Sequence, residues 1–153
     1  MADACSGSWK GSLLVYAAGF RGSARRLRSR SGCRLYLRAP STDVDLSNVE
    51  AWLFGSADVP VGSFGDLDFA GMQILASLLE VFPNAAAWQL GYSALLRQLS
   101  VGGGHLPEHA SKAQQTDPGA IGCACADRHS LPAMREHGHF VDQEAFDLAV
   151  AAK

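Results

Sequence analysis

The sequence has little of what identifies secreted, membrane-spanning or disordered proteins. Its 4 cysteines are too few and too scattered for a disulfide framework. It has no apolar run of about eighteen residues, and no charged segment followed by an apolar one near its start, so neither a membrane span nor a signal peptide is expected. Apolar residues make up 48% and charged residues 18%, which excludes general disorder. We therefore expect reduced thiols, a cytoplasmic location and no membrane partner.

The length of the chain limits the number of domains it can form. A chain of 153 residues and 16.2 kDa suits one domain and is too short for two of ordinary size. We expect either a single unit or a fragment of something longer. The predicted divisions are an irregular N-terminus at 1–12, an α/β core at 13–101, an exposed polar loop at 102–121, and a helical C-terminal segment at 122–153 that packs on the core.

The net charge of −2 conceals a strong asymmetry. Residues 1–40 carry eight Lys or Arg against one acid, whereas residues 41–153 carry five against fourteen. Most of the basic residues are arginines concentrated between residues 21 and 38. No apolar stripe accompanies this cluster, so it favours a polyanionic partner over a membrane surface. The alternative is a solvated basic face.

Short apolar runs alternate with helical patterns along the chain. The predicted strands lie at 13–17, 34–38, 59–64 and 85–90, and the predicted helices at 23–30, 47–54, 69–82, 93–99, 131–136 and from Asp142 to the C-terminus. The expected N-caps include Ser47, Ser93 and Asp142, and Gly138 is expected to end the helix at 131–136. Strands that alternate with helices imply a parallel sheet of the α/β class.

Two aspartates, Asp66 and Asp68, lie where an apolar strand ends and a strong helical pattern begins. Open α/β sheets place their ligands at this edge. Residues i and i+2 of an extended segment point the same way, about 6–7 Å apart at Cα, so both carboxylates can reach one divalent cation or bracket two. Gly71 would let a phosphate or a neighbouring strand approach. The alternative is structural: Asp68 is also a good N-cap, and Asp66 suits a turn.

A second pair with the same spacing, Asp43 and Asp45, begins like a calcium-binding loop. The sixth loop position is Asn48 instead of glycine, and the twelfth is Phe54 instead of an acid. The sequence therefore does not predict a calcium site there. The histidines and cysteines likewise follow no zinc-binding spacing.

The segment Gly65-Asp66-Leu67-Asp68-Phe69-Ala70-Gly71 resembles the Gly-Asp-x-Asp-x-x-Gly motif of Toprim domains. The likeness is strongest to the nuclease subunit of Wadjet plasmid-defence systems and its relatives, and more distant to the A subunit of topoisomerase VI. Upstream, residues 14–20 resemble the strand and Gly-aromatic turn that precede this motif. Downstream, residues 126–128, 131–135 and 140–144 resemble the C-terminal segment of the family, with its Gln-Glu pair.

This resemblance implies a Toprim-like, Rossmann-like parallel sheet of about four strands between helices. It also implies Mg²⁺ or Mn²⁺ bound by Asp66 and Asp68, with Glu144 as an additional catalytic or phosphate-site acid. Glu144 alternatively suits the first turn of a helix, where an acid is favoured by the helix dipole. The activity implied is Mg²⁺-dependent DNA cleavage, with condensin-like defence-complex subunits as partners; a homodimer is left open.

DNA would meet the basic part of the chain in this interpretation. Arginine side chains hold the phosphate backbone through salt-dependent contacts that do not read sequence. The residues expected to do so are Arg21, Arg25, Arg26 and Arg28.

One departure from the family bears on activity. Toprim domains carry a glutamate at the end of their first strand, and Asp3 is the sole acid among residues 1–12. We therefore expect the C-terminal part of a longer protein or a decayed copy. The competing hypothesis is a catalytically inactive fragment or interaction module that keeps the fold, with weak DNA or metal binding. A third is a small α/β binding protein whose aspartate pair is only a capped turn.

Overall fold

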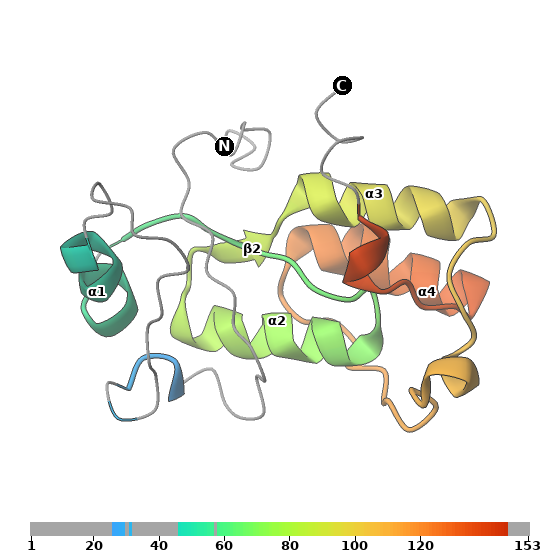
Figure 1. Cartoon of the computed structure of the whole chain (residues 1–153), viewed down its shortest axis with the longest axis horizontal. Coiled ribbons are helices and arrows are strands. Elements are labelled where there is room, and N and C mark those ends of the chain that lie inside the picture. The colour runs from blue at the N-terminus through green and yellow to red at the C-terminus, as the bar shows by residue number, and fades with distance from the viewer. Residues whose placement is uncertain (1–25, 30, 32–45, 57, 147–153) are drawn as a thin grey trace.

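The computed structural model describes residues 26–29, 31, 46–56 and 58–146. Its main elements are α1 (Leu46–Phe54), β1 (Val61–Ser63), α2 (Phe69–Val81), β2 (Ala85–Ala87), α3 (Gln89–Ser100) and α4 (Leu131–His137). The four helices and β2 are labelled in Figure 1. Short helical turns lie at Pro107–Ala110, Ala126–Ser130 and Gln143–Ala145, the second of them π-helical and the others 3-10. The strands predicted at 13–17 and 34–38 lie outside the described residues. Of the helix predicted at 23–30 only 26–29 are described, and they form a turn closed by the Ser29 N–H on the Arg26 carbonyl at 3.1 Å.

The described part is a mixed α/β structure with a small parallel sheet flanked by helices. β1 and β2 pair in parallel, with Val61 opposite Ala85 and Ser63 opposite Ala87. α2 connects the two strands and packs against β2. The α/β class expected from the alternating pattern is therefore confirmed. The expected four-stranded sheet remains a prediction, because two of its strands fall on residues outside the description.

Helix α2 follows from local sequence signals. Asp68 has extended backbone angles and accepts a hydrogen bond at Oδ1 from the Gly71 N–H at 2.6 Å, so it is the N-cap. Met72 and Leu75 are buried on the face that meets the core. Pro83 follows shortly after the last turn, where it cannot continue the helix. The helix predicted at 69–82 is confirmed to within a residue.

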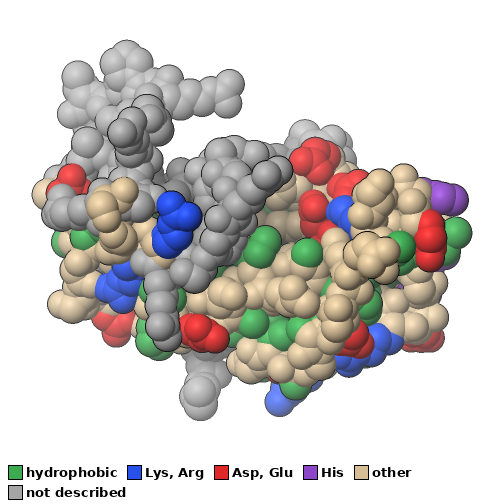
Figure 2. All heavy atoms as spheres, turned by 90° about the horizontal axis from the view of Figure 1, so that it is seen from below, with side chains coloured by type: hydrophobic (Ala, Val, Ile, Leu, Met, Phe, Trp, Pro, Cys, Tyr) green, Lys and Arg blue, Asp and Glu red, His purple; other side chains and the backbone are tan. Residues whose placement is uncertain are grey.

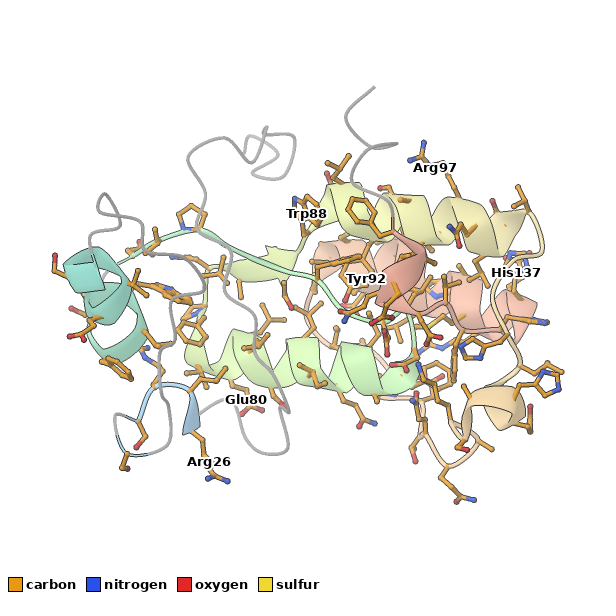
Figure 3. The ribbon with its side chains drawn as sticks, in the orientation of Figure 1. Arg26, Glu80, Trp88, Tyr92, Arg97 and His137 are labelled. Atoms are coloured by element: carbon orange, nitrogen blue, oxygen red, sulfur yellow. The ribbon has the colours of Figure 1, made fainter. Side chains whose placement is uncertain are left out.

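Two predicted helix starts are wrong. α3 begins at Gln89, after Trp88, and not at Ser93, because the strand before it ends at Ala87. α1 begins at Leu46, so Ser47 lies inside the helix. Figure 3 shows Tyr92 pointing from α3 toward the interior and Arg97 pointing away from it.

Of the two predictions for the C-terminal part of the described chain, one is confirmed and one is wrong. α4 ends at Gly138, which adopts a left-handed φ of 65°, as predicted. Of the helix predicted from Asp142 to the C-terminus, Gln143–Ala145 form one 3-10 turn and Phe146 is already extended, while 147–153 lie outside the described residues. The Asp142 side chain makes no cap hydrogen bond and contacts Lys112 and His105 instead.

The core forms where α2, α3 and α4 meet the strands. The residues of the main cluster with no more than 2% exposure lie between 67 and 99 and between 126 and 141: Leu67, Met72, Leu75, Ala87, Tyr92, Leu95, Leu99, Ala126, Leu131, Met134, Phe140 and Val141. A smaller cluster beside α1 contains Leu53, Phe82 and Ala85. Because Leu67 belongs to the main cluster, the aspartates on either side of it are held by the core of the protein.

Candidate cation site at the start of α2

Backbone pairing brings three distant segments together at the start of α2. Leu67 and Val141 form an antiparallel bridge, with N–H to carbonyl distances of 2.8 and 3.1 Å. Phe140 pairs in the same way with His105, at 2.9 Å in both directions. The segment at 140–141 therefore lies between the aspartate motif and the beginning of the 105–119 loop. The resemblance implied that Glu144, in the segment at 140–144, is a further acid of the site, and the backbone pairing brings residues 140–141 of that segment beside the aspartate motif.

Three carboxylates converge on the ammonium group of Lys112. Its Nζ lies 3.1 Å from Oδ2 of Asp66, 2.8 Å from Oδ2 of Asp68 and 2.6 Å from Oδ1 of Asp142. The side chain of Asp68 is 3% exposed, that of Lys112 17%, that of Asp66 35% and that of Asp142 44%. Figure 2, the face seen from below, shows acidic side chains beside a basic one toward its upper right. The site is thus buried at Asp68 and opens to solvent toward Asp142.

The two motif aspartates also accept hydrogen bonds from neutral donors. Asp66 Oδ1 accepts from the Gln143 N–H at 2.9 Å. Asp68 Oδ1 accepts from the Gly71 N–H, and its Oδ2 accepts from Gln115 Nε2 at 3.0 Å. Asp68 is therefore both the cap of α2 and a member of the carboxylate group, so the two interpretations of this residue are compatible.

The 105–119 loop is fixed to the body of the protein by polar contacts. The Ala70 N–H donates to Gln115 Oε1 at 3.0 Å, and Gln73 Nε2 donates to the Thr116 carbonyl at 2.9 Å. Farther along, Arg135 on α4 forms two hydrogen bonds of 2.7 Å with Asp117. The segment predicted as an exposed polar loop is polar and largely exposed, but these contacts hold it across the start of α2.

The charges of the site act on one another. Burial alone would lower the pKa of Lys112, but the hydrogen bonds that its ammonium donates to Asp142, Asp68 and Asp66 outweigh burial and raise the pKa above its usual value. The same hydrogen bond from Lys112 lowers the pKa of Asp142, with a further contribution from His105, whose Nε2 lies 3.3 Å from Oδ1. At neutral pH the site therefore holds a charged Lys112 ammonium beside the ionised carboxylate of Asp142.

The donor chemistry suits a hard cation, but the present arrangement is not a metal cage. Carboxylate oxygens are the ligands that Mg²⁺ and Mn²⁺ prefer. Within the described part of the chain, however, no group of three or more His, Cys, Asp or Glu residues is arranged to hold a metal ion. The point on which Asp66, Asp68 and Asp142 converge is taken by Lys112. Asp66 and Asp68 could hold a divalent cation only with that ammonium moved away.

Glu144, expected as a further acid of the site, is exposed and accepts from Gln143 Nε2 at 3.3 Å. Its neighbour Gln143 makes the direct contact with Asp66. The Gln-Glu pair thus lies beside the aspartate motif, and the contact between them is the hydrogen bond from the Gln143 backbone N–H to Asp66.

The predicted DNA-binding arginines are described in part. Arg26 is exposed, and Arg21 and Arg25 lie outside the described residues. The guanidinium of Arg28 donates to the carbonyls of Val81, at 3.0 Å, and Gly55, and lies 5.3 Å from the centre of the Phe82 ring. Arg28 therefore joins α1 to the C-terminal end of α2, a structural role that its sequence position did not indicate.

The aspartate motif and Arg28 lie at opposite ends of one helix. Asp68 caps the start of α2 and Arg28 binds its last residue, Val81. A helix of 13 residues is about 20 Å long at about 1.5 Å per residue. The cation site and this arginine therefore do not form one pocket, although an extended ligand such as a duplex could reach both.

Gly71 has a local reason for being glycine. A Cβ at this position would collide with the Asp66 carbonyl oxygen and press on Oδ1 of Asp68, at 3.2 Å. The close approach that the sequence predicted there is made by the motif's own backbone. The second glycine of the motif thus allows Asp66 and Asp68 to pack against the first turn of α2.

Comparisons with protein-family models, with curated proteins and with solved structures found no match for this chain. In the part of the chain that the structure describes, no helix is long and apolar enough to cross a membrane.

Sequence reasoning missed the role of Lys112, Gln115 and His105 in this site, and assigned Asp142 to capping alone. One signal was available: Lys112 is the only basic residue between Arg97 and Arg128 in the acidic part of the chain. A single lysine in such a segment is weak evidence that it forms an ion pair. Its position in the sequence does not identify which carboxylates it contacts.

Proposed function

We propose that this chain is a Toprim-like domain of a Mg²⁺-dependent DNA-cleaving protein of the plasmid-defence type. The observation that supports the proposal is that Asp66 and Asp68, at the junction of β1 and α2, both present an oxygen to one cationic atom, at 3.1 and 2.8 Å. Their positions match the motif of the family and the edge where α/β sheets bind ligands.

The chemistry of the proposal rests on residues of this chain. Asp66 and Asp68 would hold Mg²⁺ or Mn²⁺, which would neutralise phosphate charge and help activate water or stabilise the leaving oxygen. Asp142 adds negative charge at the solvent-exposed side, and Gln143 orients Asp66 through its N–H. Exposed arginines such as Arg26 would hold the DNA backbone, and Glu144 would contribute as a further acid.

Metal-dependent stability tests the metal site. We expect Mg²⁺ or Mn²⁺ to raise the melting temperature of the wild-type protein, because a ligand that binds only the folded state stabilises it. Asp66→Asn with Asp68→Asn should abolish this rise. Asp58→Asn is the matched control, since Asp58 is exposed and bonded to Asn84 outside the site. Equal stabilisation of the double variant and the wild type would refute the metal assignment.

DNA binding and cleavage are tested separately. Duplex affinity should fall steeply with salt and should drop on replacing Arg25 and Arg26 by Ala, because phosphate contacts release counterions. Nicking of a supercoiled plasmid should require the divalent cation and both motif aspartates. Affinity that does not change with salt would contradict a phosphate-contacting role for the arginines.

The second candidate is a catalytically inactive module that keeps the fold and binds DNA weakly. One observation favours it: the Lys112 ammonium already neutralises part of the charge of the three carboxylates. This candidate predicts salt-dependent DNA affinity with no cleavage at any divalent cation concentration. Metal-dependent nicking that disappears in the Asp66→Asn variant would exclude it.

A further inference from the structure

We propose that Lys112 is an internal cation that occupies the metal position of this site, so that the 105–119 loop must withdraw before a divalent cation can bind. This inference rests on the proposed function, in which Asp66 and Asp68 are the metal ligands. The ammonium lies within 3.1 Å of an oxygen from each of Asp66, Asp68 and Asp142. Like a bound metal ion, the ammonium is a positive charge surrounded by carboxylate oxygens.

The two cations exclude each other by distance and by charge. Mg²⁺ binds carboxylate oxygens at about 2.0–2.1 Å and keeps most of its other ligands as water. The Lys112 nitrogen already occupies the point on which oxygens of Asp66, Asp68 and Asp142 converge, and an ion held between those same oxygens would need that point. Positive charges so close together repel strongly in a partly buried site. Binding of a metal ion and binding of Lys112 are therefore alternative states.

The loop is built so that it can leave without disrupting the core. Its contacts with the start of α2 are polar, from Lys112, Gln115 and Thr116. Most of its residues from Glu108 to Asp117 are exposed, so withdrawal uncovers little apolar surface. The Asp117–Arg135 pair can remain closed and act as the fixed end, because it lies beyond these contacts.

Removal of the Lys112 ammonium should lower the stability of the metal-free protein and raise its affinity for a divalent cation. Without Lys112, Asp66, Asp68 and Asp142 repel one another with no cation between them. Lys112→Met should therefore lower the melting temperature in the presence of a chelator and strengthen Mn²⁺ binding at least tenfold over wild type. The rise in melting temperature on adding the metal should be larger for Lys112→Met than for the wild type.

The experiment is a Mn²⁺ titration followed by electron paramagnetic resonance, with melting curves on the same samples. It compares the wild-type chain, Lys112→Met, Asp66→Asn with Asp68→Asn, and the triple variant. Arg97→Met is the control, because it removes one positive charge at an exposed position of α3. Tighter binding by Lys112→Met, unchanged binding by Arg97→Met and no binding by the aspartate variants would support the inference.

Two other outcomes are informative in different ways. If the wild type binds Mn²⁺ through the aspartates and Lys112→Met binds no more tightly, the competition is refuted while the metal site of the proposed function stands. If neither the wild type nor Lys112→Met binds Mn²⁺, the metal site itself is refuted, and the inference falls with it.

A second measurement uses the wild type alone, in case Lys112→Met does not fold. Amide hydrogen exchange across 108–116 should become faster as Mn²⁺ is added, because this part of the loop leaves the site when the metal enters. Exchange in α4 serves as the internal reference. Exchange in the loop that stays the same or slows at saturating Mn²⁺ would overturn the proposal.

Discussion

The ammonium nitrogen of Lys112 lies 2.8 Å from Oδ2 of Asp68, a carboxylate whose side chain is 3% exposed. A buried carboxylate is costly unless its charge is paired and its oxygens are hydrogen-bonded. Asp68 meets both conditions, since Lys112 supplies the charge and Gly71 and Gln115 supply further donors. The cap of α2 and the closure of the 105–119 loop therefore depend on the same side chain.

Two substitutions at Asp68 should separate its capping role from its charge. Asp68→Ala removes both and should destabilise the protein by about 2 kcal/mol or more, because a lost N-cap costs about 1 kcal/mol and Lys112 and Gln115 also lose an acceptor. Asp68→Asn keeps an oxygen for the Gly71 N–H and should lose less. Urea unfolding of both variants measures the difference. An Asn variant as unstable as the Ala variant would show that the cap contributes little.

Arg28 and Arg26 provide a matched pair with different roles. Arg28→Met should lower the free energy of unfolding by about 1 kcal/mol or more, because it removes hydrogen bonds to the Val81 and Gly55 carbonyls and the contact with Phe82. Arg26→Met should leave stability within about 0.5 kcal/mol, since Arg26 is exposed. Thermal and urea melts compare the two. Equal effects would contradict the structural role of Arg28.

The Asp117–Arg135 pair should make stability depend on acid. Hydrogen bonds from Arg135 hold the pKa of Asp117 at about 2, below the ordinary 3.8. Since the folded pKa is the lower one, the contribution of the pair is fully present above about pH 4 and is lost as the pH falls toward 2. Arg135→Met should flatten this part of the unfolding profile, measured by urea melts between pH 6 and 2. A profile with the wild-type slope would show that the pair is not the source.

The parts of the fold that could be predicted are those fixed by neighbouring residues. The apolar spacing and the cap at Asp68 define α2 locally, and Gly138 ends α4 because its left-handed φ suits glycine. The predicted start of α3 is wrong because the run Ala85 to Leu90 is apolar except for Gln89 and does not show where strand pairing stops. In the structure β1 has only three residues, so β2 pairs as far as Ala87 and the helix begins at once.

Of the residues in the site, the sequence predicts Asp66 and Asp68 as members but does not predict Lys112. The aspartates are two residues apart on one segment, so their proximity follows from strand geometry. Lys112 reaches them across 46 and 44 positions of the sequence, through a loop with no hydrophobic periodicity. The role of Asp142 was hidden for the same reason, since the bridge between Leu67 and Val141 that brings it near is a tertiary contact.

Gly71→Ala should destabilise the protein even though alanine favours helix. In an unconstrained helix interior the change would stabilise by about 1 kcal/mol, but here the added Cβ collides with the Asp66 carbonyl oxygen. Relief of such a clash typically costs about 1–3 kcal/mol, and it moves Asp66 relative to Asp68. We expect a net loss of stability in urea melts and weaker Mn²⁺ binding, with Ser93→Ala, at an exposed position of α3, as the control for helix propensity. A variant more stable than the wild type would show that the first turn of α2 can move away from the motif without cost, and that the glycine is not needed to hold Asp66 in place.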